Sequence, residues 1–130
     1  MKVPYPDVNA GLAAKAHMYI CKHNDNDSYE FVKCQTLKPK MLFNNHFKHF
    51  VDEEADISRN PFNHMTRIDC DKVFTTENVQ YDETLRTTIR PDVCQELYNE
   101  IIEELNEDGY DIIQMNEEEL TNINSKINQR

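Results

Sequence analysis

Two runs of strand-forming residues lie near the N-terminus: 16–22 has a strand-like mix of residues, and 29–36 alternates between hydrophobic and polar positions. In the second run, Phe31 falls on one face of a strand and Val32 on the other. The stretch between the runs, HNDNDS, is rich in side chains that bond to their own backbone, which is typical of a turn. The pattern predicts a half-buried antiparallel hairpin that ends before Pro39, because proline cannot donate to a strand ladder.

The middle of the chain has no single pattern. The hydrophobic residues of 41–65 recur at helical spacing, which predicts a short helix, but the segment also fits a long loop with a strand that folds back on the sheet. Two short runs of strand-forming residues in 66–76 predict a pair of strands, and 79–89 predicts one more strand or a turn. For 41–65 both alternatives stay open.

The most distinct predicted element is a helix near the C-terminus. Pro91 suits the first position of a helix, and Gly109 supplies a left-handed stop. A second, shorter helix is predicted further on, with Asn116 as its N-cap and Glu119 three residues later. The apolar residues of the first helix form one stripe along its length: Val93, Leu97, Tyr98, Ile101, Ile102 and Leu105.

The order of these elements predicts an α+β fold in one domain, 1–130. We expect a small, strongly twisted antiparallel sheet, barrel-like in shape, with C-terminal helices laid against it. An irregular lead-in should cover 1–14, strands and loops most of 15–89, and helices most of 91–127. A length of 130 residues is normal for a domain with one core.

The cysteines and the hydrophobic runs bear on the compartment. The four cysteines are spread singly, without a CxxC pair, and we expect them to be reduced. No run is apolar enough for a membrane span, and the N-terminus lacks the pattern of a secretory signal. We therefore expect a cytoplasmic protein that does not bind a membrane.

Charge is divided unevenly along the chain. Residues 1–70 hold nine Lys/Arg and nine Asp/Glu, whereas 71–130 hold five and fifteen, so the net charge of -10 belongs to the second half. An acidic protein of this kind is a poor nonspecific binder of duplex nucleic acid, which requires a positive surface. With only Gly11 and Gly109, the chain also has no glycine-rich phosphate loop.

One region runs against the overall charge. Residues 15–50 hold six lysines and three acids. In an antiparallel hairpin the start of the first strand lies beside the end of the second, so side chains from both are expected at one rim. A rim of this composition is suited to an anionic substrate such as a phosphodiester, although the spacing alone favours a simpler interpretation, in which these side chains are only the polar edge of a sheet. The candidates are Lys15, His17, Gln35, Thr36 and Lys38, joined by Arg59, His64 and Arg67 if 41–65 folds back.

A metal site is a weaker candidate. His46 and His49 are three residues apart, and Asp52, Glu53 or Glu54 could complete a set of ligands. Without a nearby cysteine pair, we interpret the two histidines as solvated or hydrogen-bonded side chains. We expect no metal and no other cofactor.

Four stretches together resemble the MazF/PemK-type toxins of toxin–antitoxin modules: AGLAAKAHMYICK, FVKCQT, NPFNHMTRIDCDKVFTT and LRTTIRPDVCQELYNEIIEEL. The resemblance covers roughly residues 9–105 and concerns the order and pattern of the elements. It implies an SH3-like barrel, a homodimer, an antitoxin partner and a metal-independent endoribonuclease that cleaves single-stranded RNA. By this resemblance Lys15 takes the place of the catalytic arginine and Thr36 lies near that of the catalytic threonine, with His17 assisting. Gln35, Lys38, Arg59, His64 and Arg67 would then contact the substrate.

The acidic second half supports an alternative from another class. Fifteen carboxylates in 71–130 could contact a basic partner, with the domain serving as a noncatalytic interaction module. Under this hypothesis the barrel is retained as a scaffold and the rim of the hairpin has no chemistry to perform.

Overall fold

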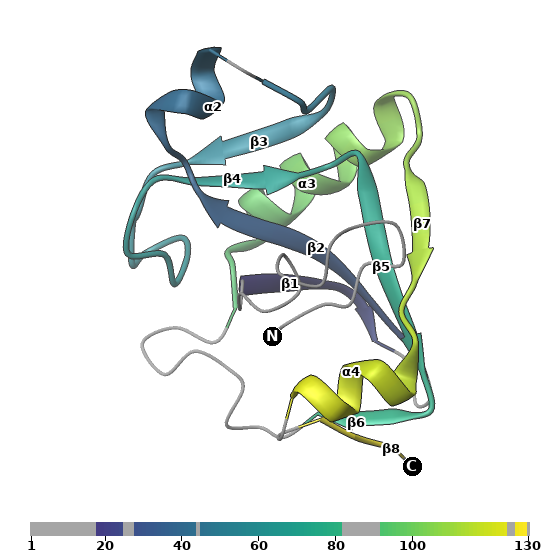
Figure 1. Ribbon diagram of the computed structural model, residues 1–130. Coiled ribbons are helices and arrows are strands. Elements are labelled where there is room, and N and C mark those ends of the chain that lie inside the picture. The colour runs from purple at the N-terminus through teal and green to yellow at the C-terminus, as the bar shows by residue number, and fades with distance from the viewer. Residues whose placement is uncertain (1–17, 25–27, 44, 82–91, 125–126, 130) are drawn as a thin grey trace.

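The protein is described by a computed structural model, which covers residues 18–24, 28–43, 45–81, 92–124 and 127–129. Its main feature is a mixed six-stranded sheet (Figure 1). The strands follow the order β3 (Phe50–Glu53), β4 (Thr66–Asp69), β2 (Ser28–Thr36), β5 (Lys72–Glu77) and β7 (Asp111–Gln114), and β1 (Met18–Asn24) pairs with β2 outside this path. Together with the helices, this arrangement confirms the α+β class.

The N-terminal hairpin is confirmed. β1 (Met18–Asn24) and β2 (Ser28–Thr36) are antiparallel, with Met18 opposite Cys34 and an irregularity near Cys21. The start of β1 therefore lies beside the end of β2, as the sequence pattern required.

The sheet bends sharply where β4 (Thr66–Asp69) gives way to β5 (Lys72–Glu77). β4 pairs with the last residues of β2, and β5 pairs with its first residues. β3 (Phe50–Glu53) extends the sheet beyond β4. Successive strands thus share one long partner, which gives the sheet its twisted shape.

The expectation of an antiparallel, barrel-like sheet needs correction. β7 (Asp111–Gln114) runs parallel to β5, because α3 (Gln95–Glu107) carries the chain back before the strand begins. The sheet is therefore mixed, and the strands of the described residues form no closed barrel.

Both alternatives for 41–65 occur, one after the other. α2 (Pro39–Phe43) is a short helix that begins at Pro39, and β3 then folds back on the sheet. The helical spacing of the hydrophobic residues predicted a helix but placed it too late in the chain, because the spacing continues into residues that form β3.

The long C-terminal helix is confirmed with a later start. α3 (Gln95–Glu107) begins after Cys94, which acts as its N-cap; Pro91 lies outside the described residues. Leu97, Ile101 and Leu105 are buried against the sheet, as the stripe predicts. Gly109 has φ +77°, the left-handed conformation expected of the stop.

The rest of the C-terminal part packs beneath the other face of the sheet. α4 (Glu117–Ile123) has the predicted cap, since Asn116 Oδ1 accepts a hydrogen bond from Glu119 N at 2.9 Å. β6 (Val79–Tyr81) pairs with β8 (Ile127–Gln129) in a second, two-stranded sheet. The sequence pattern did not predict β7, which lies within the stretch 91–127 expected to be mainly helical, or β8, which begins at its end.

Two clusters of buried residues lie on opposite faces of the sheet. Val32 and Ile68 belong to the first cluster, which α3 covers. Phe31 and Phe74 belong to the second, which β6, α4 and β8 cover. The alternation of Phe31 and Val32 between faces is the one that the sequence predicted.

All four cysteines are free thiols, as expected. Cys34 and Cys70 are buried, Cys94 is half-buried and Cys21 is exposed. Burial raises the pKa of Cys70 to about 12, which leaves the thiol protonated and unreactive. No helix in the described part of the chain combines the length and the apolar character that a membrane crossing requires.

Candidate functional site

A small hollow opens where β2 ends and β1 begins. Its volume is about 180 Å³. The lining comes from the two strand ends and from the segment that leads into β4: Met18, Cys34, Gln35, Thr36, Phe62, Asn63, His64 and Thr66. The hollow therefore lies at the rim that the sequence analysis singled out.

Backbone and side-chain hydrogen bonds fix the segment that leads into β4. Leu37 N donates to Met65 O at 2.8 Å, which ties the end of β2 to the approach to β4. Thr66 Oγ1 donates to His64 O at 2.9 Å, and Thr66 is opposite Thr36 in the ladder. His64 is thus positioned by the sheet itself.

A buried asparagine anchors the same segment from behind. The Asn60 side chain donates to Glu53 Oε2 and to Glu54 O, each at 2.9 Å, and its Oδ1 accepts from Phe62 N at 3.0 Å. Asn60 is fully buried. Because all these bonds are internal, Asn60 shapes the wall of the hollow and is not itself accessible.

Three of the predicted site residues line the hollow: Gln35, Thr36 and His64. Lys38 follows two residues after Thr36 and is exposed, but it is not part of the lining. Lys15 and His17 lie outside the described residues, although Met18, the next residue in the chain, lines the hollow. Their placement there stays a prediction.

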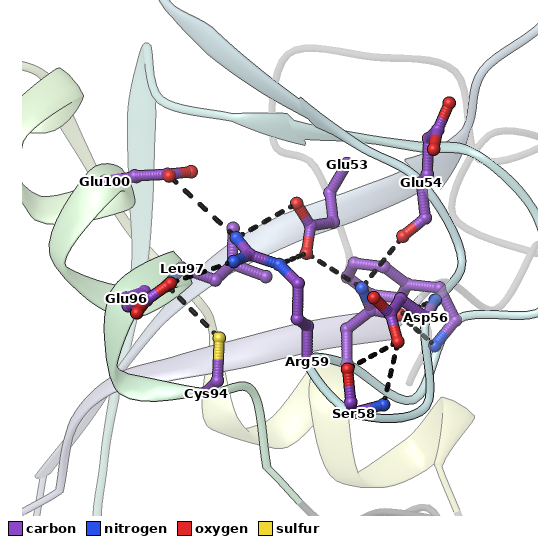
Figure 2. A network of polar contacts seen from close by, with 11 residues as sticks. Glu53, Glu54, Asp56, Ser58, Arg59, Cys94, Glu96, Leu97 and Glu100 are labelled. Atoms are coloured by element: carbon purple, nitrogen blue, oxygen red, sulfur yellow. Dashed lines mark hydrogen bonds and ion pairs between the residues drawn. The ribbon is translucent and has the colours of Figure 1, made fainter.

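Arg59 is directed elsewhere. Its guanidinium binds Glu53 through Nε at 2.9 Å and Glu96 through Nη1 at 3.2 Å, and Glu100 lies 3.9 Å from Nη2 (Figure 2). The hydrogen bonds to Glu53 are the main reason that the pKa of Arg59 is raised. Arg59 therefore fastens the turn after β3 to α3.

Arg67 is also engaged within the protein. Its side chain is only 3% exposed and binds both oxygens of Asp52, at 2.8 Å each. The guanidinium carbon lies 3.8 Å from the centre of the Phe50 ring. The hydrogen bonds to Asp52 are the main reason that the pKa of Arg67 is raised. The contacts with Asp52 and Phe50 together hold Arg67 within the β3–β4 pair.

The chemistry of the hollow follows from its lining. The side chains of Gln35, Asn63, Thr36 and His64 offer amide, hydroxyl and imidazole groups, while Phe62 supplies an aromatic surface. The lining residues include no lysine, arginine or carboxylate. The described part of the hollow can bind a neutral polar group and move a proton, whereas a cation for a phosphate must come from nearby residues.

Asn63 and Met18 were not singled out from the sequence. Asn63 adjoins His64 in a stretch that looks like an ordinary polar turn around Pro61. The only sequence signal that could have indicated Asn63 is therefore its position next to His64.

The two histidines considered as metal ligands, His46 and His49, have different surroundings. His46 is exposed, whereas both ring nitrogens of His49 are engaged, Nδ1 with Glu104 at 3.0 Å and Nε2 with Asp108 at 2.9 Å. Within the described ranges no three His, Cys, Asp or Glu side chains are grouped as metal ligands would be.

Comparison of the chain with models of known protein families, with curated proteins and with solved structures gave no match.

Proposed function

We propose that the hollow is the site of a toxin-like, metal-independent endoribonuclease that acts on single-stranded RNA in the cytoplasm. The observation that carries this proposal is the meeting of Gln35, Thr36 and His64 around one hollow, at the start of β1. Lys15 and His17 precede that start in the chain. A homodimer and an antitoxin partner belong to the same proposal.

The reaction needs few groups. The RNA 2′-oxygen forms a bond to the adjacent phosphorus while the bond from phosphorus to the 5′-oxygen breaks. A base takes the proton of the 2′-hydroxyl and an acid supplies one to the 5′-oxygen, leaving a 2′,3′-cyclic phosphate. His64 or His17 serves as acid or base, the Thr36 hydroxyl donates to a phosphate oxygen, and Lys15 offsets the charge of the transition state.

In this proposal the neutral residues that line the hollow also bind a base of the RNA. Amide groups such as those of Gln35 and Asn63 can hydrogen-bond to the edge of an unpaired base, and Phe62 can contact its face. The bent sheet, in which β4 and β5 share β2, is the part of the fold that supports the finer proposal of an SH3-like barrel.

An RNase assay tests the proposal. The protein should cleave single-stranded RNA in the presence of EDTA and leave 2′,3′-cyclic phosphate ends. Thr36→Ala, His64→Ala and Lys15→Ala should each reduce the rate, with a loss of about 100-fold or more for an acid–base group.

Two substitutions away from the hollow are matched controls. His46→Ala and Thr121→Ala remove the same side-chain types from exposed or half-exposed positions. Both variants should cleave at the wild-type rate. RNA that stays intact with pure protein at high concentration would refute the nuclease proposal.

A second candidate is favoured by the engagement of Arg59 and Arg67 with carboxylates of the same chain. The outer side of α3 meanwhile exposes Glu96, Glu100 and further acids. Under this proposal the domain is a noncatalytic module that binds a basic protein.

Charge reversal tests the second candidate. Glu103→Lys with Glu107→Lys should abolish co-purification with a basic partner, because both residues are exposed on α3. Glu104 is left intact, since it binds His49. Glu118→Lys with Glu119→Lys on α4 is the control, and equal loss in both pairs would show only nonspecific attraction.

A further inference from the structure

The exposed end of α2 combines hydrophobic and basic side chains. Phe43 is 87% exposed and Leu42 is 64% exposed. Lys38 and Lys40 are exposed beside them, and no carboxylate occurs anywhere in 31–51. We call Lys38, Lys40, Leu42 and Phe43 the α2 knob. Such exposed aromatic and aliphatic side chains are typical of an interaction surface.

An open hollow of opposite character follows β3. Its volume is about 560 Å³, and it contains four carboxylates against one guanidinium. Ile57, 68% exposed, adds a hydrophobic side chain. We call it the acidic hollow, and its main lining residues are Asp52, Glu53, Glu54, Asp56, Ile57 and Arg59.

Two carboxylates of the acidic hollow bind arginines of the same chain, whereas the residues at its edge are exposed. Glu53 binds Arg59 and Asp52 binds Arg67. Glu54 is exposed, and its carboxylate points away from the Arg59 network (Figure 2). The rim therefore presents negative charge and a hydrophobic side chain to a docking partner.

We propose that the α2 knob of one molecule docks into the acidic hollow of a second copy, and that the contact is reciprocal. The basic and hydrophobic side chains of the knob match the acidic and hydrophobic ones of the hollow. In a two-fold symmetric dimer both patches must lie on one face of the molecule. The turn after β3 and α2 both lie toward the same end of β3 and β4 (left in Figure 1).

The charges favour a second copy of this chain as the partner that binds the α2 knob. The knob requires a partner with negative charge around a hydrophobic depression, and this chain itself carries one. A reciprocal contact uses both patches at once, so neither is left exposed. The proposed function includes a homodimer, and this contact assigns its surface. No residue that lines the hollow at the end of β2 belongs to the α2 knob or to the acidic hollow, so loss of self-association and loss of RNA cleavage are separate outcomes.

Sedimentation velocity over a range of protein concentrations tests the proposal. Salt of about 0.15 M, at which the Debye length is ~8 Å, limits the repulsion between two acidic molecules. The wild type should dimerise, and Leu42→Ser with Phe43→Ser should weaken the dimer at least about tenfold. Ile112→Ser, which removes a hydrophobic side chain that is 66% exposed on β7, should leave the dimer unchanged.

A charge exchange identifies the two surfaces. Lys40→Glu and Glu54→Lys should each weaken self-association, because each places like charges at both contacts of the dimer. A mixture of the two variants should form a heterodimer, in which opposite charges face each other at both contacts. Since both residues are exposed, circular dichroism should show unchanged folding.

Three results would overturn the proposal. The wild type could stay monomeric up to its solubility limit, the dimer could persist in the knob variants, or the mixture could fail to associate. A monomer that sediments with phosphatidylserine vesicles and loses this binding in the Leu42/Phe43 variant would assign the knob to a lipid surface instead.

Discussion

His49 connects the segment before β3 to the end of α3 through both of its ring nitrogens. Nδ1 lies 3.0 Å from Glu104 Oε1 and Nε2 lies 2.9 Å from Asp108 Oδ2. Its backbone N–H also donates to Asp71 Oδ1. Both ring nitrogens can donate only in the charged imidazolium, which also suits the negative C-terminal end of a helix. The hydrogen bond to Glu104 is the main reason that the pKa of His49 is raised.

We predict that His49 makes the free energy of unfolding depend on pH. A raised pKa in the folded state gives stabilisation that is complete below the ordinary value of 6.5 and is lost as pH rises through the folded value. The difference between wild type and His49→Gln should therefore be large at about pH 5.5 and small at about pH 8.5. Urea unfolding across this range measures the difference.

The control for His49 is His46, which is exposed. His46→Gln should have the same pH profile as the wild type. A His49→Gln variant whose stability differs from the wild type by the same amount at every pH would contradict the ion-pair interpretation.

Arg67 supports a prediction about stability. Its side chain is 3% exposed, so Arg67→Met leaves the Asp52 carboxylate without its partner. We expect the free energy of unfolding to fall by about 3 kcal/mol, because an unpaired charge beside the sheet is costly. Adding Asp52→Asn should recover part of this loss. Chemical denaturation of the single and double variants measures both effects.

The same residue shows what sequence could not reveal about the site. Arg67 and Arg59 were reasonable candidates for a phosphate because their residue type suits it. Their actual partners, Asp52 and Glu53, lie on β3. The Arg67–Asp52 contact depends on the pairing of β3 with β4, and the Arg59–Glu53 contact depends on the path of the turn after β3. Gln35 and Thr36 were easier to place, because a hairpin register fixes the end of β2.

At the scale of elements, the end of α3 depends on Gly109. Its φ is +77°, and an added Cβ would meet no atom within 4 Å. Gly109→Ala should therefore destabilise the fold through backbone strain alone, by about 1 kcal/mol. Gly109→Asn should cost less, because asparagine adopts the left-handed conformation more readily. Thermal denaturation measures the two variants, and equal losses would argue against backbone strain.

Elements with local signals were predicted, and elements that depend on distant pairing were not. α3 has an apolar stripe, and α4 has a cap whose donor is three residues away. β7 spans four residues, only one of them half-buried, and it is a strand because β5 lies beside it. The bend between β4 and β5 likewise depends on how both strands pair with β2.

At the scale of the whole molecule, one sheet separates two hydrophobic clusters. The first contains the buried face of α3. The second is rich in aromatic residues, with Tyr19 edge-on to Phe74 at a centroid distance of 5.8 Å and Tyr29 near Tyr81 at 4.7 Å. Neighbouring residues of β2 enter different clusters, so neither face can lose its packing without disturbing the strand that both share.

We therefore predict that the two clusters unfold together. The chain has no tryptophan, and Tyr19, Tyr29 and Tyr81 pack against the second cluster. With Tyr5, Tyr98 and Tyr110 replaced by phenylalanine, every remaining tyrosine belongs to that cluster, so tyrosine fluorescence reports on it, while far-ultraviolet circular dichroism reports mainly on α3 and hence on the first cluster. Both signals should give the same urea midpoint. Phe74→Leu removes volume from a fully buried site and should lower the free energy of unfolding by about 1–2 kcal/mol.

The decisive comparison is the shift of the two signals in Phe74→Leu. If β2 transmits the loss of packing, the circular dichroism midpoint falls as far as the fluorescence midpoint, although α3 touches the opposite face. Conversely, Ile101→Val in the first cluster should lower the fluorescence midpoint, which reports on the second cluster. Midpoints that separate in either variant would mean that each face of the sheet holds its own cooperative unit, joined only through the backbone of β2.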